Sequence, residues 1–208
     1  SDLRGALRHP QVSHYPAITD PEELPGLLRA IAGYRGQPVT IAALKLASLL
    51  FVRPGELRHA AWQDFNLEEA TWSFLPSKNS APLIVPLPRQ AVRILRELYP
   101  LTGGGHFVLP GLRSSKRPMS ENTMKAALDS MGFKGRHTAH GFRATARTII
   151  AERLNYQEHY VEQQLAHRVR DPNGRAYNRT KYLDQRREML QAWADYLDEL
   201  RDGHPVPA

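Results

Sequence analysis

The sequence predicts an α+β domain that is mainly helical and carries a small antiparallel three-stranded sheet. Apolar residues recur at helical spacing along most of the chain, as in residues 180–200. The helical spacing of apolar residues is absent in residues 71–75 and 83–87. These are two short runs of β-branched, aromatic and aliphatic residues that flank a turn rich in Pro and Ser, a pattern typical of two strands. Hydrophobic residues make up 41% of the 208 residues, which is sufficient for one substantial core.

Capping signals place the helices along the chain. Residues 19–23 combine a cap, a Pro in the first turn and two acidic residues, and they precede an apolar stripe. The next helix, over residues 39–52, is apolar on most sides and is therefore expected to lie at the centre of the fold. Residues 106–109 are expected to form the third strand. Further helices are expected to begin at Pro54, Pro88, Ser120 and Thr138, and two more to cover residues 156–166 and 180–200.

The chain is expected to form one domain with a short lead-in. Residues 1–18 show little periodicity and are expected to be an irregular linker, whereas residues 19–208 form the domain. The chain begins with Ser-Asp rather than Met, so we expect it to be a piece of a longer protein. It contains no Cys, which excludes disulfides and Cys-based zinc sites. No apolar run reaches the roughly 20 residues that a membrane helix needs and no signal-peptide pattern is visible, so we expect a cytoplasmic protein without a membrane partner.

Positive charge is concentrated in one part of the chain. The formal net charge is +7, and residues 111–181 alone carry 14 Lys or Arg against 6 Asp or Glu, a net charge of +8. Such clustering is typical of proteins that bind a polyanion, although a solvated basic face is the alternative. The end of the last helix is acidic instead, and its acidic residues are Asp195, Asp198, Glu199 and Asp202. The tail after about Leu197 is expected either to dock on a basic neighbour or to fold back on its own chain.

The basic segment contains a candidate anion site at the start of a helix. Thr138 is expected to cap this helix, and His140 and Arg143, three residues apart, share one of its faces. Unpaired N–H groups and the helix dipole attract anions at this end, so an imidazole and a guanidinium there form a suitable phosphate cradle. The alternative for this pair is a capping or packed His and a solvated Arg.

Two other basic residues stand at unusual positions. Arg53 follows an apolar helix and precedes Pro54, which places it at a corner between two helices. A guanidinium is costly there unless it faces a cleft or a partner, and Glu56 is near enough to hold it. A purely structural Arg–Glu pair is the alternative. Lys78 lies in the turn between the two strands, where most Lys side chains are simply solvated.

No metal site accompanies these residues. His137 and His140 are three residues apart, but no third ligand lies at metal-site spacing, so neither a metal nor another cofactor is expected. The remaining combination of basic groups and Tyr suits phosphoryl transfer on nucleic acid, because fixed cations stabilise the negative charge of a phosphate transition state. Tyr, whose free pKa is about 10, becomes a competent nucleophile where cations favour its phenolate.

Four motifs follow one another along the chain: Phe-Val-Arg-Pro-Gly-Glu-Leu at 51–57, His-Gly-Phe-Arg-Ala-Thr-Ala-Arg at 140–147, Leu-Ala-His at 165–167 and Ala-Tyr-Asn-Arg-Thr at 176–180. In these motifs and their order, the chain resembles the tyrosine recombinases, also called the phage integrase family, over about residues 19–197. The motif sequences are similar to those of the branch found in P4-type prophages and genomic islands. The resemblance implies the helical catalytic domain of these enzymes, preceded by the N-terminal DNA-binding domains that family members carry.

The resemblance implies a role for each candidate residue. Tyr177 attacks a backbone phosphate, forms a 3′-phosphotyrosine link and releases a 5′-hydroxyl, whose oxygen Lys78 protonates. The two Arg hold the non-bridging oxygens, Glu56 braces one of them, and the two His assist by hydrogen bonding and proton handling. One phosphodiester replaces another, so neither ATP nor metal is required. The implied catalytic set is Arg53, Lys78, His140, Arg143, His167 and Tyr177.

The function implied by the resemblance is site-specific recombination, in which a mobile element is integrated and excised at attachment sites in double-stranded DNA. The implied assembly is a homo-tetramer on DNA, with a monomer expected when the protein is free and an accessory DNA-bending protein as a further partner. DNA contacts are expected from the basic segment, at Lys116, Arg117, Arg147, Arg175 and Arg179.

Three alternatives stay open. Tyr182 is the rival nucleophile, because the gap from His167 to Tyr177 is one residue longer than in many relatives; its other possible role is packing beside Leu183. A type IB topoisomerase shares the chemistry but rejoins the same strand. A DNA-binding module that no longer cuts needs the cations but no Tyr at this position.

Overall fold

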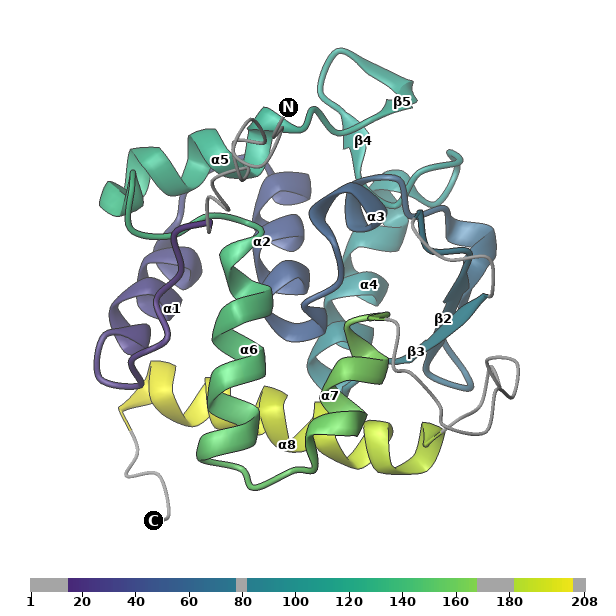
Figure 1. The fold of residues 1–208 in the computed structure, drawn as a ribbon. Helices are drawn as coiled ribbons and strands as arrows, with labels where there is room; N and C mark the ends of the chain where they lie inside the picture. The colour runs from purple at the N-terminus through teal and green to yellow at the C-terminus, as the bar shows by residue number, and fades with distance from the viewer. Residues whose placement is uncertain (1–14, 78–81, 168–181, 204–208) are drawn as a thin grey trace, which may run out of the picture.

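The computed structural model describes residues 15–77, 82–167 and 182–203, and the helices pack around α2 with the small sheet at one side (Figure 1). This arrangement confirms the predicted mainly helical α+β class. The helices are α1 (Leu24–Gly33), α2 (Pro38–Leu50), α3 (Pro54–Arg58), α4 (Arg89–Thr102), α5 (Asn122–Leu128), α6 (Gly141–Glu152), α7 (Glu158–Gln164) and α8 (Leu183–Asp202), with a 3-10 turn at Trp62–Asp64 and a π-helical turn at Asp129–Phe133. The strands are β1 (Phe65–Asn66), β2 (Thr71–Phe74), β3 (Leu83–Pro86), β4 (Pro110–Gly111) and β5 (Ser114–Pro118).

Helix α2 lies at the centre of the core, as its apolar sequence predicts. Leu44 and Leu50 are fully buried, and α1, α4, α6 and α8 all contact this helix. After its last turn, Phe51 adopts a left-handed conformation (φ 39°, ψ 32°) and redirects the chain. The buried ring of Phe51 meets Trp193 of α8 edge to face, at 6.4 Å between ring centroids. The Trp193 indole in turn donates a hydrogen bond to the Ser48 carbonyl at 2.9 Å, so α8 is fixed along the C-terminal half of α2.

The predicted three-stranded antiparallel sheet is present, in the order β1-β2-β3. Trp72 of β2 faces Val85 of β3 across the predicted hairpin. The third strand, β1, follows from a local turn: the Asn66 side chain accepts hydrogen bonds from the backbone N–H groups of Glu68 and Glu69, at 3.1 and 3.0 Å. An Asn side chain that binds the backbone two or three residues ahead reverses the chain tightly. The strand therefore turns directly back into β2.

The prediction that residues 106–109 form the third strand is wrong. Phe107 makes only an isolated bridge to Ala61. The Val108 N–H donates to the Ala60 carbonyl at 2.9 Å, so this segment pairs with the short connection after α3 instead of with the sheet. A second antiparallel hairpin, β4 and β5, follows it and was not predicted.

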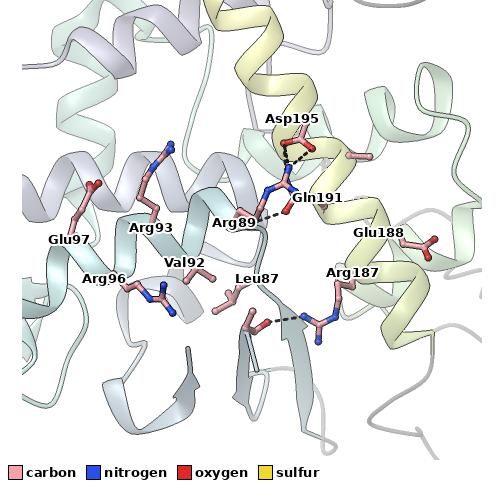
Figure 2. Close-up of a pocket in the computed structure, with 12 residues that line it drawn as sticks. Leu87, Arg89, Val92, Arg93, Arg96, Glu97, Arg187, Glu188, Gln191 and Asp195 are labelled. Atoms are coloured by element: carbon pink, nitrogen blue, oxygen red, sulfur yellow. Dashed lines mark hydrogen bonds and ion pairs between the residues drawn. The ribbon is translucent and has the colours of Figure 1, made fainter. Parts of the chain in front are cut away.

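The acidic end of α8 packs on α4 of the same chain. Asp195 accepts hydrogen bonds from Arg89 at 3.2 Å and from Gln90 at 2.8 Å. Asp198 accepts a hydrogen bond from Gln90 at 2.9 Å and pairs with Arg201 at 2.8 Å. Asp195 and Asp198 are therefore engaged by their own chain, whereas the end of the tail, residues 204–208, lies outside the described residues. The same two helices flank a groove of about 1010 Å³, with the Arg89–Asp195 pair among the residues that line it (Figure 2).

The end of the lead-in is fixed to the N-terminus of α6. The Pro16 carbonyl accepts a hydrogen bond from the backbone N–H of Thr138 at 3.1 Å and one from the Thr138 hydroxyl at 3.3 Å. Gly141 permits this approach, because a Cβ at that position would lie 2.5 Å from the Pro16 carbonyl oxygen. Residues 15–18, which the sequence assigned to an irregular linker, are thus packed against the helix that carries the predicted His and Arg.

His137 is a buried structural side chain in the same contact. Only 1% of its surface is exposed. Its Nδ1 accepts the Ile18 N–H at 3.1 Å, and its ring lies 4.4 Å from the Phe142 ring between centroids. Burial lowers the pKa of His137 to about 4, from an ordinary value of 6.5. The ring is therefore neutral at pH 7, which suits its role as an acceptor.

Gly141→Ala is expected to destabilise the domain by about 1–3 kcal/mol, because the added methyl group overlaps the Pro16 carbonyl and forces the lead-in away from α6. Gly26→Ala is the matched control, since Gly26 also lies in a helix and nothing lies within 4 Å of a Cβ built there. This control is expected to gain about 0.5–1 kcal/mol, because Ala is a better helix former than Gly. Thermal unfolding measures both changes, and equal unfolding temperatures for the two variants would contradict the close approach.

Acid is expected to destabilise the domain through His137. The unfolded chain takes up a proton near pH 6.5, whereas the folded chain takes it up only when the pH reaches the folded pKa of about 4. The free energy of unfolding is therefore highest above pH 6.5, and it decreases by roughly 3 kcal/mol as the pH falls to about 4. His137→Asn keeps an acceptor near the Nδ1 position but cannot ionise. The free energy of unfolding in urea, measured from pH 7 to pH 4, is expected to fall more steeply for the wild type than for this variant; parallel curves would exclude the effect.

Candidate active site

Arg53 lies at the corner between α2 and α3, in the extended conformation that the following Pro54 favours. Its guanidinium binds the Glu56 carboxylate at 2.9 Å, and its backbone N–H donates to the same carboxylate at 3.2 Å. Its Nη2 also donates to the Ala166 carbonyl at 3.4 Å, beyond the end of α7. The predicted Arg–Glu pair at a helix corner is thus confirmed. With 16% of the Arg53 side chain exposed, the guanidinium is oriented and still reachable from solvent.

Glu56 also connects this corner to the strand hairpin. The backbone N–H and the hydroxyl of Ser77 lie 3.3 and 3.5 Å from Glu56 Oε1. Ser77 directly precedes Lys78, which lies outside the described residues. One carboxylate therefore orients the guanidinium and fixes the chain just before the predicted Lys.

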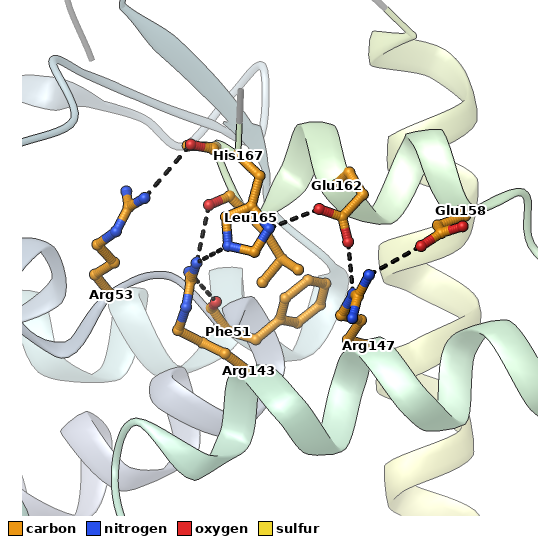
Figure 3. A network of polar contacts seen from close by, with 9 residues as sticks. Phe51, Arg53, Arg143, Arg147, Glu158, Glu162, Leu165 and His167 are labelled. Carbon is orange, nitrogen blue, oxygen red and sulfur yellow. Dashed lines mark hydrogen bonds and ion pairs between the residues drawn. The ribbon is translucent and has the colours of Figure 1, made fainter. Parts of the chain in front are cut away.

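Arg143 is buried where α2, α6 and α7 meet (Figure 3). Its Nη1 donates to the Phe51 carbonyl at 3.0 Å, just after the last turn of α2. Its Nη2 donates to the Leu165 carbonyl at 2.9 Å and lies 3.2 Å from Nε2 of His167. The residue is 6% exposed, so its donors are directed by fixed acceptors rather than by solvent. The alternative of a solvated Arg at this position is wrong.

The guanidiniums of Arg53 and Arg143 form a pair of cations that we call the arginine cradle. Burial is the main cause that lowers the pKa of Arg143 to about 10, and the charge of Arg53 adds to it. The carboxylates of Glu56 and Glu162 oppose this shift. Arg143 stays protonated at neutral pH because its pKa lies well above 7. Two guanidiniums near enough for their charges to interact favour a nearby anion.

His167 lies beside the arginine cradle and contacts a carboxylate on its other side. Its Nδ1 lies 2.6 Å from Oε2 of Glu162 on α7. The other oxygen of Glu162 accepts Nε–H of Arg147 at 2.6 Å, and Arg147 also binds Glu158 at 2.9 Å (Figure 3). Burial alone would raise the pKa of Glu162, but the hydrogen bonds from His167 and Arg147 outweigh it and hold this pKa below its usual value. Arg147, a predicted DNA contact, is thus engaged by two carboxylates of its own chain.

His140 directly precedes the first residue of α6, and it is half-buried. The predicted cap by Thr138 is confirmed, because its hydroxyl accepts the Gly141 N–H at 3.0 Å. The His140 ring lies 4.3 Å from the exposed Tyr15 ring between centroids. Arg143 follows one turn later, so both members of the predicted pair lie at the same end of α6.

The remaining predicted residues fall into two groups. Lys116 and Arg117 lie on β5 with exposed side chains. Four others lie outside the described residues and keep the status of predictions: Lys78, Arg175, Tyr177 and Arg179.

Tyr182, the rival nucleophile, lies where α8 begins and has a left-handed backbone (φ 57°). Its half-buried ring lies 4.6 Å from the His159 ring and 5.1 Å from the Tyr160 ring, between centroids. These contacts place the phenol among the aromatic side chains of α7, which agrees with the packing role that the sequence offered as its alternative.

Two residues beside the site were not predicted. Glu162 is separated from His167 by five positions, and an acid on a short polar helix gives no signal of its own. Tyr15 belongs to a segment without periodicity. Within the described ranges, no group of three or more His, Asp or Glu side chains could hold a metal ion. No helix in the same ranges is long and apolar enough to cross a bilayer.

Comparison with known proteins agrees with this geometry. The chain matches the Phage integrase family over residues 18–182. It is 37% identical over 221 residues to the integrase of Enterobacteria phage P4, covering 98% of this chain and 50% of the phage protein. Among solved structures, the integrase from mycobacterium phage Brujita aligns with a TM-score of 0.64 at 18% identity, covering 99% of this chain and 64% of that chain. The lambda integrase tetramer bound to a Holliday junction aligns with a TM-score of 0.57 at 17% identity, covering 83% and 53%.

These likenesses have different weight. The solved structures, at 17–18% identity, show a shared fold. The chain spans about half the length of the curated relatives that it matches. The family match extends over most of the chain and includes the arginine cradle, His140 and His167. This chain therefore belongs to the phage integrase family.

Proposed function

We propose that this chain is the catalytic part of a site-specific DNA recombinase that integrates and excises a mobile element. The observation that carries the proposal is the arginine cradle with His167 at its edge, assembled from distant segments in a chain of the phage integrase family. The P4 relative is named an integrase, and a structural relative was captured as a tetramer on a Holliday junction. Both descriptions support DNA as the substrate here.

The arginine cradle suits the phosphate at which a DNA strand is cut. Negative charge builds on the non-bridging oxygens during attack, and cations that are already oriented stabilise it without reorganisation. Glu56 orients Arg53, and the carbonyls of Phe51 and Leu165 orient Arg143. A guanidinium also offers paired donors that match two phosphate oxygens, which an ammonium group does not.

In the proposed reaction, Tyr177 is the nucleophile. Its oxygen forms a bond to phosphorus while the bond from phosphorus to the 5′ oxygen breaks, which leaves a 3′-phosphotyrosine link. Lys78 donates a proton to the departing 5′ oxygen, and His140 and His167 assist by hydrogen bonding and by handling the phenol proton. The 5′-hydroxyl of a partner strand reverses the step and restores the Tyr. Bonds are exchanged one for one, so no cofactor is part of the proposal.

The proposed substrate is a pair of duplex attachment sites held by four copies of the protein, which are monomers before they bind DNA. An accessory DNA-bending protein and a cytoplasmic location belong to the same proposal. Residues 1–18 would link residues 19–208, the catalytic domain, to preceding DNA-binding domains. The exposed Lys116 and Arg117 of β5, together with Arg175 and Arg179, would contact the phosphate backbone.

Tyr177→Phe is expected to abolish the covalent adduct with DNA, because the nucleophilic oxygen is removed. Tyr182→Phe is the matched control and is expected to retain the adduct, since its ring packs against His159 and Tyr160. Trapping on a nicked suicide duplex, resolved on a denaturing gel, measures both. If the adduct survives Tyr177→Phe and disappears with Tyr182→Phe, the assignment of the nucleophile is wrong. If it survives both changes, the proposed reaction is wrong.

Arg53→Lys is expected to slow adduct formation by about 100-fold or more, because one cation that stabilises the transition state loses its paired donors. The unfolding temperature is expected to change little, since Lys can still pair with Glu56. Arg93→Lys, an exposed position on α4, is the control and is expected to react at the wild-type rate. If Arg53→Lys forms the adduct at the wild-type rate, the Arg53–Glu56 pair has a structural role and Arg53 is not required for cleavage.

A further inference from the structure

The contacts of His167 determine which ring nitrogen carries its proton. Nδ1 lies 2.6 Å from Oε2 of Glu162, and Nε2 lies 3.2 Å from Nη2 of Arg143 (Figure 3). A guanidinium only donates hydrogen bonds, so Nε2 must accept. An ionised carboxylate only accepts, so Nδ1 must donate. The neutral imidazole with its proton on Nδ1 satisfies both contacts at once.

The other protonation states of the ring fit these contacts poorly. A proton on Nε2 alone would direct an N–H group at a guanidinium and a lone pair at a carboxylate. A doubly protonated ring keeps the contact with Glu162 but turns one donor toward another. Among the described residues, the charged groups that contact the ring or the groups bound to it are Arg143 and Arg147 on α6 and Glu162 on α7, and the Arg53–Glu56 pair lies nearby, at the Ala166 carbonyl.

Glu162 is itself held in place by Arg147. Its side chain is 17% exposed, and its Oε1 accepts the Arg147 Nε–H at 2.6 Å. The Nη2 of Arg147 reaches Glu158 at 2.9 Å, and the Glu158 side chain is 70% exposed. Both oxygens of Glu162 therefore have fixed partners, one on each side. Among the described contacts, Glu158 reaches Arg147 but not His167.

We propose that Glu162 is the positioning residue of His167. It holds the proton on Nδ1 and turns Nε2 toward the arginine cradle, and Arg147 braces it from behind. The catalytic consequence rests on the proposed function: Nε2 is then the ring atom that faces the substrate phosphate. A carboxylate that fixes the tautomer of an imidazole also stabilises the imidazolium that forms when the ring takes a proton. The same contacts give Arg147 a structural role, because its guanidinium orients Glu162.

Nuclear magnetic resonance of the chain with 15N-labelled His rings tests the tautomer, because the two neutral forms give different ring-nitrogen shifts. The spectrum of His167→Gln assigns the signal among the nine His residues. The wild type and E158Q are expected to carry the His167 proton on Nδ1. E162Q is expected to increase the form protonated on Nε2, because the amide can donate to Nδ1. A wild-type ring protonated on Nε2, or an unchanged tautomer in E162Q, would overturn the proposal.

Adduct formation on the suicide duplex gives the second measurement. E162Q is expected to react about 10- to 100-fold more slowly than the wild type, as when a residue that orients a reactive group is removed. E158Q is expected to stay within about twofold, since an exposed ion pair contributes little. A normal rate for E162Q would overturn the positioning role in catalysis. If the wild type itself forms no adduct, the proposed function fails, and the ring-nitrogen spectra alone decide the inference.

Discussion

The buried guanidinium of Arg143 is the interaction on which the rest of the site depends. It ties the first turn of α6 to the end of α2 through the Phe51 carbonyl and to the end of α7 through the Leu165 carbonyl. A buried cation is costly unless its donors are satisfied and opposite charges lie nearby. Here the direct partners described are two carbonyls and one imidazole, and Glu56 and Glu162 supply the opposing charge. The residue that we propose as a phosphate ligand is therefore also the residue that joins the helices around it.

Two of the non-Gly residues with positive φ lie beside this guanidinium. Phe51 and Ala166 both adopt left-handed conformations, with φ of 39° and 52°, and neither is a Gly. Each presents its carbonyl to one member of the arginine cradle, Phe51 to Arg143 and Ala166 to Arg53. A left-handed conformation costs an L-residue roughly 1–2 kcal/mol. For Phe51 the burial of its ring against Trp193 offsets this cost, so part of the stability of the core maintains the geometry of the site.

Features that depend on neighbours along the chain could be predicted from the sequence. The Arg53–Glu56 corner and the Thr138 cap each involve residues within three positions of each other, and both are present. The central place of α2 followed from its sequence, which is apolar on most sides.

Features that depend on distant segments could not be predicted. Residues 106–109 have the composition of a strand, but their backbone partners lie next to Ala60, a pairing that no local pattern encodes. The contact between Glu162 and His167 depends on how α7 ends and on an Arg from another helix. The positions of Lys78 and Tyr177 relative to the arginine cradle stay predictions.

The acceptors that hold the arginine cradle have a consequence for mutational tolerance. Phe51, Leu165 and Ala166 contribute main-chain carbonyls, and a point substitution replaces a side chain but keeps the carbonyl. No single exchange at these positions can therefore delete an acceptor. The requirement at positions 51 and 166 is instead one of backbone shape, and β-branched residues are disfavoured there because φ is positive. Positions 51 and 166 are therefore expected to accept only residues that tolerate a left-handed backbone, whereas position 165, whose Leu side chain is buried, is expected to accept only residues that fit the core.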